Sequence, residues 1–200
     1  ANTSIIKIIQ SVTDSINAFV QTNADTNTNI GATGVKKLYI KPTYKANAWN
    51  WGNITPSVVL NDSVCREIGR SNINYSVVNN VIVSGENQGV AVNATREGTA
   101  GDKPASSITE PLITTREAGV ERARHIISKS GAWVNHTLSL FSLLPPNSSL
   151  PLLLAGDFIQ MNESGNLWIG QVTGNSIQSG WTNEGLKTTQ TITVEQYIGE

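Results

Sequence analysis

Three residues of this sequence could take part in nucleophilic or metal chemistry: Cys65, His125 and His136. A thiol beside an imidazole base is the pair that cysteine hydrolases use for covalent catalysis. No hydrolase signature surrounds Cys65, and His125 falls within a predicted helix, so we do not predict a cysteine hydrolase. No third ligand accompanies the two histidines at the spacing of a zinc site, and we predict no metal centre.

The carboxylates are scattered along the chain. Those that come closest to a cluster are Asp102, Glu110, Glu117 and Glu121. A glycosidase needs two carboxylates facing each other across a cleft, whereas helix capping and solvated helix faces account for these four more simply. The glycines form neither a GK[ST] nor a GxGxxG phosphate loop. We therefore predict no catalytic residue and no cofactor, and expect a protein that is not an enzyme.

Two tryptophans suggest a different kind of site. Trp49 and Trp51 are separated by one residue, so an extended segment would place both indoles on one face. Such a face can stack on a sugar ring, although paired tryptophans more often belong to a core or an interface. A carbohydrate- or receptor-binding β module that uses Trp49 and Trp51 is therefore the alternative function.

The composition limits the partners. Of the 200 residues 14% are charged, well below the roughly one quarter that is usual in globular proteins, while Asn, Ser and Thr are plentiful. This composition favours a β-rich protein with uncharged polar faces. The net charge of −1 provides no electrostatic attraction for nucleic acid, and we expect no nucleic-acid partner.

The ends of the chain and the search for processing signals add little information about the function. Cys65 is the only cysteine, which excludes an internal disulfide, and the sequence begins at Ala1, so either an initiator methionine was removed or the chain is part of a longer one. It shows no signal-peptide pattern, and no apolar run approaches the roughly 20 residues of a membrane span. We treat the Asn-x-Ser/Thr sequons as accidental; they include Asn53, Asn74, Asn93, Asn135 and Asn162.

A well-marked helix is predicted over residues 114–130. Thr114 and Glu117 have the spacing of a capping box, and Gly131 follows where a left-handed C-cap is expected. Its apolar residues recur at helical spacing: Val120, Ala123 and Ile127.

A second, amphipathic helix is predicted over residues 4–20, with Ser4 as its N-cap. The apolar stripe of this helix consists of Ile5, Ile9, Val12, Ile16 and Phe19. The stripe is wide for so short a helix. It packs either on its own domain or against a partner subunit, and the pattern leaves both open.

The remaining patterns indicate short strands. A hairpin is predicted from Val81 to Val92, and alternation is cleanest over residues 191–198. Short strands separated by turn signals favour a small β-barrel or sandwich, so we predict a mainly β fold with about two helices. We expect three segments: an N-terminal helix with a polar linker (1–34), a β-rich segment with an irregular connector (35–113), and a helix followed by a closing, barrel-like segment (114–200).

The C-terminal three fifths resembles a known family. The stretch NNVIVSGENQGVAVNATREGTAGDKPASSITEPLITTREAGVERARHIISKSG, followed by LPLLLAGDFIQM, LWIGQVTGN and TITVEQY, resembles the hub or tail-tip proteins of tailed bacteriophages and prophages. The match covers about residues 77–200, and the order of the short pieces is what makes it specific. Residues 1–76 have no comparable match.

The resemblance implies a non-enzymatic structural protein of the virion that is assembled in the cytoplasm of the bacterial host. It implies a ring, typically a homotrimer, at the phage tail tip or baseplate. Its neighbours would be the distal tail ring, the tape measure and the tip or fibre proteins. As interface candidates we take the residues of the N-terminal stripe together with the large aromatics Trp133, Trp168, Trp181 and Tyr197, because such side chains dominate interface energetics.

Overall fold

The computed structural model describes residues 4–24, 36–87, 89–141, 150–183 and 185–199. The chain divides into two compact units, residues 1–45 with 78–128 and residues 46–77 with 129–200. Each unit is therefore assembled from two separate stretches of the sequence. No helix in the described part of the chain is long and apolar enough to cross a membrane.

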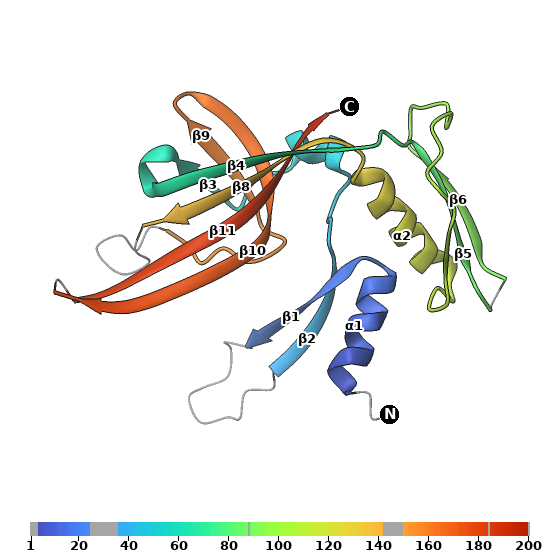
Figure 1. Ribbon diagram of the computed structural model, residues 1–200, viewed down its shortest axis with the longest axis horizontal. Helices are drawn as coiled ribbons and strands as arrows, with labels where there is room; N and C mark the ends of the chain where they lie inside the picture. The colour runs from blue at the N-terminus through green and yellow to red at the C-terminus, as the bar shows by residue number, and fades with distance from the viewer. Residues whose placement is uncertain (1–3, 25–35, 88, 142–149, 184, 200) are drawn as a thin grey trace. The chain divides into compact units, whose positions relative to one another are not determined.

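The first unit contains both α-helices and two small sheets (Figure 1). Its elements are α1 (Ile5–Ser15), β1 (Ala18–Ala24), β2 (Lys36–Pro42), β5 (Asn80–Gly85), β6 (Ala91–Thr95), β7 (Ile108–Glu110) and α2 (Arg116–Ser128). Strands β1 and β2 form an antiparallel pair, and β6, β5 and β7 form a three-stranded sheet. Helix α2 packs on β5 and β6.

Helix α2 confirms the predicted helix, with changes at its start and on its buried face. Thr115, not Thr114, provides the cap, because its Oγ1 accepts a hydrogen bond from the backbone N–H of Ala118 at 3.3 Å. The buried side includes Gly119, Ala123 and Ile127, while Val120 is exposed. The residue at position 119 must be small because a Cβ there would lie 2.9 Å from Cγ2 of Val92 on β6.

Helix α1 is capped by Ser4 as predicted, since Ser4 Oγ accepts from the N–H of Lys7 at 3.4 Å. It ends at Ser15 and does not continue to residue 20. Asn17 has a φ of +51°, a left-handed conformation that stops the helix, and its carbonyl accepts hydrogen bonds from both the N–H and Oγ1 of Thr43. The chain then turns into β1, so Phe19 belongs to a strand and not to the helical stripe; residues 25–34 of the predicted linker lie outside the described residues.

The second unit is built on one six-stranded sheet with the order β3-β9-β10-β11-β8-β4. Its elements are η1 (Ala48–Asn53), β3 (Val58–Asn61), η2 (Asp62–Val64), β4 (Cys65–Tyr75), β8 (Gly131–Leu140), β9 (Phe158–Glu163), β10 (Asn166–Thr182) and β11 (Gly185–Gly199). All neighbouring strands are antiparallel except β3 and β9, which are parallel. The mainly β fold with two α-helices is confirmed.

The predicted closing barrel is not formed. Strands β3 and β4 occupy the two edges of the sheet, and no pairing joins them among the described strands. The short η2 connects β3 directly to β4, so two consecutive strands end at opposite edges. One face of the open sheet still encloses an apolar core of Leu60, Leu138, Leu140, Leu153, Ile159, Met161, Trp168, Val172, Ile192 and Val194.

At Gly170 the backbone of β10 lies very close to residues of the neighbouring strand β11. A Cβ at position 170 would lie 2.6 Å from Cγ1 of Val194 and 2.7 Å from the carbonyl oxygen of Glu195. These distances are too short for any side chain, and the carbonyl belongs to a paired strand that cannot move away. The sheet can therefore tolerate only glycine at this position.

We expect Gly170→Ala to destabilise the second unit by about 1–3 kcal/mol, the usual cost of overpacking a core. The change should be measured as a fall in the urea midpoint of unfolding. Gly180→Ala on the same strand is the matched control, since a Cβ there meets nothing within 4 Å. Equal midpoints for the two variants would contradict the argument.

Candidate functional site

The structure does not activate Cys65. Burial, followed by the charges of Asp62 and Glu163, raises the pKa of its thiol to about 11. The thiolate, which is the nucleophilic form, is therefore scarce at neutral pH. Cys65 pairs with Leu140 at one end of β8, whereas His136 pairs with Arg70. The rise of a strand puts roughly 14 Å between these two positions on β8, too far for a nucleophile and its base.

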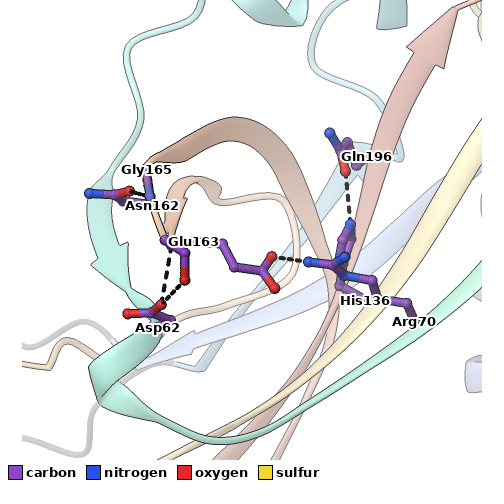
Figure 2. A network of polar contacts seen from close by, with 8 residues as sticks. Asp62, Arg70, His136, Asn162, Glu163, Gly165 and Gln196 are labelled. Atoms are coloured by element: carbon purple, nitrogen blue, oxygen red, sulfur yellow. Dashed lines mark hydrogen bonds and ion pairs between the residues drawn. The ribbon is translucent and has the colours of Figure 1, made fainter.

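His136 is a core residue. Its side chain is 2% exposed, and its ring stacks on the indole of Trp168 with a centroid distance of 4.0 Å and an interplanar angle of 16°. Nε2 lies 2.8 Å from Oε1 of Gln196 on the neighbouring strand (Figure 2). Burial lowers the pKa of His136, so the ring is neutral at pH 7. A neutral imidazole enclosed in this way has no route to a substrate.

The charged groups near His136 hold the sheet and its β9–β10 turn in place (Figure 2). Arg70 on β4 forms an ion pair with Glu163 at the end of β9. Asp62 accepts hydrogen bonds at 3.1 Å from both the N–H and the Oγ of Ser164, whose φ is +51°. Both carboxylates are thus engaged in structural contacts, and the described residues contain no group of three or more His, Cys, Asp or Glu side chains that could hold a metal ion.

The predicted tryptophan face at residues 49–51 is wrong. These residues form the 3-10 helix η1 and not an extended strand, so the two indoles do not alternate onto one face. Trp51 is buried and contacts Trp133 and Phe158 edge-on, each with a centroid distance of 5.3 Å. Its Nε1 donates to the carbonyl oxygen of Ala46 at 3.2 Å. Trp51 is therefore part of the core of the second unit and cannot stack on a glycan.

The large aromatics named from the sequence differ in their surroundings. Trp133 and Trp168 are buried in the second unit, and Tyr197 packs edge-on against Trp133 at 5.3 Å. Trp181, near the tip of the β10–β11 hairpin, is 83% exposed. Trp181 is therefore the only one of these four side chains that is largely exposed.

Helix α1 presents an apolar surface. Ile5 is 75% and Ile8 53% exposed, and Ile6 and Val12 are also exposed, while Ile9 and Ile16 are partly buried. Of the predicted stripe, Ile5 and Val12 are exposed on the helix, whereas Phe19 lies in β1; the use of the stripe as an interface stays a prediction. We call the exposed set Ile5, Ile6, Ile8 and Val12 the α1 surface.

A further apolar set was not selected from the sequence. Leu38, Tyr39 and Ile40 on β2 are all exposed. A β-strand alternates its side chains between two faces, so three consecutive exposed residues mean that both faces of the β1–β2 pair are uncovered in this part of the chain. The sequence contains this set as an apolar run between lysines, KKLYIK, but such a run is equally typical of a buried strand.

The buried state of His136 makes the stability of the second unit depend on pH. Because the folded pKa is lower than that of an ordinary histidine, near 6.5, the unfolded chain binds the proton more readily. The neutral form of His136 therefore contributes its full stabilisation at a pH above the pKa of the histidine in the unfolded chain. This contribution is lost as the pH falls towards the pKa of His136 in the folded chain. We expect the urea midpoint of His136→Gln, which keeps a polar side chain beside that of Gln196, to fall less than that of the wild type between pH 7.5 and 5.5. The carboxylates titrate in both proteins, so equal pH dependence would rule out this role of His136.

Comparisons with known proteins gave structural similarities only. No family model and no curated protein sequence matches the chain. A tail protein from Neisseria meningitidis MC58 is 10% identical with a TM-score of 0.45, over 72% of this chain and 45% of the other. The 43 kDa tail protein of prophage MuSo2 from Shewanella oneidensis is 14% identical with a TM-score of 0.47, over 96% and 52%.

A chain in a topological model of the p2 virion baseplate in its activated conformation is 11% identical with a TM-score of 0.33, over 99% of this chain and 54% of that one. The present chain thus spans about half the length of each of these proteins. It is similar in structure, at low identity, to phage and prophage tail and baseplate proteins.

Proposed function

We propose that this protein is a structural, non-enzymatic component of a phage tail tip or baseplate. In this role it is a hub-type protein of the virion that assembles into a ring, as a homotrimer, and connects the tail tube to the tip or fibre proteins. The family pattern in residues 77–200 supports the proposal. The engaged charges and the unactivated thiol of the second unit give no support to a catalytic alternative.

The observation that carries the proposal is the α1 surface. Exposed isoleucines that follow one another along a helix are unusual for a monomer in water, and contiguous apolar patches of this kind mark sites of association. Burial of a large aliphatic side chain contributes about 1.5–3 kcal/mol, so a few isoleucines can dominate an interface. A subunit contact through the α1 surface would remove them from water.

The helix is held in a way that suits such a contact. Its C-terminal end is anchored, because Arg122 on α2 donates from Nη1 to the carbonyl oxygen of Asp14 at 3.2 Å and from Nη2 to Glu110 at 3.2 Å. Thr13 and Ser15 in the last turn are buried. The N-terminal turns, which carry most of the isoleucines, have no such anchor among the described contacts. The helix is thus fixed at one end and presents its apolar side at the other.

The test is the mass of the protein in solution, measured by light scattering over a dilution series. We expect the wild-type chain to have three times the monomer mass of 21.4 kDa at high concentration. Replacing Ile5 and Ile8 by glutamate should weaken the association by about a hundredfold, because two side chains that the proposed interface buries would become charged. The new carboxylates lie near the helix N-terminus, where they are favourable to the helix dipole, so the helix itself should persist.

Gln10→Glu is the control for added negative charge, since it puts one carboxylate at an exposed position on the polar side of α1. It should leave the mass unchanged. A wild-type chain that stays at 21.4 kDa at every concentration, or a double variant that associates like the wild type, would overturn the role of the α1 surface.

A further inference from the structure

Strands β1 and β2 form a sheet of two strands, with no third strand beside them in the described part of the chain (Figure 1). The register places Ile40 opposite Val20 and Lys41 opposite Phe19. Helix α1 contacts β1, whereas β2 pairs only with β1 among the described strands. A two-stranded sheet is marginally stable by itself in water, and a third strand stabilises it. The outer edge of β2, over Lys36–Pro42, is therefore open to an added strand.

The exposed side chains of β2 suit a strand that lies along this edge. Leu38 and Ile40 are exposed on one face of the pair by strand alternation, while Tyr39 is exposed on the other. A ligand that docked on one face could cover only one of these two sets. An extended chain alongside β2 continues both faces of the sheet, so its own side chains contact both sets.

The charge of β2 selects the kind of strand. Its sequence, KKLYIKP, contains three lysines and no carboxylate. The ammonium group of Lys41 forms no ion pair with a described carboxylate, and Glu121, near the end of β2, is already paired with Arg124. Opposite charges on neighbouring strands attract, whereas like charges side by side destabilise a sheet. An acidic strand is thus favoured, and β2 of a second copy, with the same three lysines, is disfavoured.

We propose that the edge of β2 accepts a strand from another protein, an extended segment in which apolar residues alternate with acidic ones. Its apolar side chains lie beside Leu38 and Ile40, and its carboxylates lie on the face of Tyr39 and Lys41. The main chain of β2 supplies hydrogen bonds that give affinity, and the charges give selectivity. Binding at this edge does not require a ring, so a monomeric chain binds the same strand.

The test is the binding of short synthetic peptides to the full chain, followed by the fluorescence anisotropy of a label on the peptide. The acidic probe alternates valine with glutamate, and the basic probe alternates valine with lysine. We expect the wild type to bind the acidic probe about tenfold more tightly than the basic one. Lys41→Glu should weaken binding of the acidic probe by about fivefold and strengthen binding of the basic one. The double variant Leu38→Ser, Ile40→Ser should weaken binding of the acidic probe by about tenfold.

Lys103→Glu is the control for the change of charge and Ile82→Ser the control for the apolar change, since both side chains are exposed in the same unit but outside β1 and β2. Both controls should bind the acidic probe like the wild type, and the melting temperatures of all variants should show that each is folded. Hydrogen exchange in residues 36–42 should slow when the acidic probe binds, because an added strand protects their backbone N–H groups. The β2 edge would be rejected as the site by any of three results: no preference of the wild type for the acidic probe, unchanged affinities after Lys41→Glu, or binding without protection of residues 36–42.

Discussion

The burial of one face of the six-stranded sheet is the constraint on which the second unit depends. Strand β11 is at its centre, paired on both sides, and its residues Ile192 and Val194 are completely buried. Because strand side chains alternate, this fixes the register of β10 and β8 against β11. It also requires glycine at position 170, where β10 approaches Val194 most closely. Even the polar His136 fits this core only as a neutral ring stacked on Trp168.

The parts of the strands that do not contribute to the core remain exposed to solvent. The outer halves of β10 and β11 bury little and hold Trp181 in solvent. In the first unit, α2 packs on β5 and β6, whereas α1 contacts β1 and accepts a hydrogen bond from Arg122 near its C-terminal end. In both units, the segments that form the core thus differ from the segments that expose apolar side chains.

Sequence reasoning recovered what depends on local pattern. The hairpin around residues 81–92, with Val83 opposite Val92, the helix before Gly131 and the last strand all follow from periodicity and turn residues. Sequence reasoning failed where the structure depends on the conformation of one residue or on a contact with a distant part of the chain. Asn17 in a left-handed conformation ended α1 early, and η1 replaced the expected extended segment at Trp51. The exposure of Trp181 could not be told apart from the burial of Trp133, because it depends on where neighbouring strands stop.

The interleaving of the two units has a consequence for how the chain acquires its structure. Strand β4 pairs with β8, and β3 with β9, so residues 46–77 find their partners only after residues 78–128 have been made. Contacts between distant parts of a sequence pay for loop closure before they gain stability, and they form slowly. The inserted segment contains β5, β6, β7 and α2, whose contacts are local. During synthesis this segment can become compact first and bring the two halves of the larger sheet together, which shortens the loop that the sheet has to close.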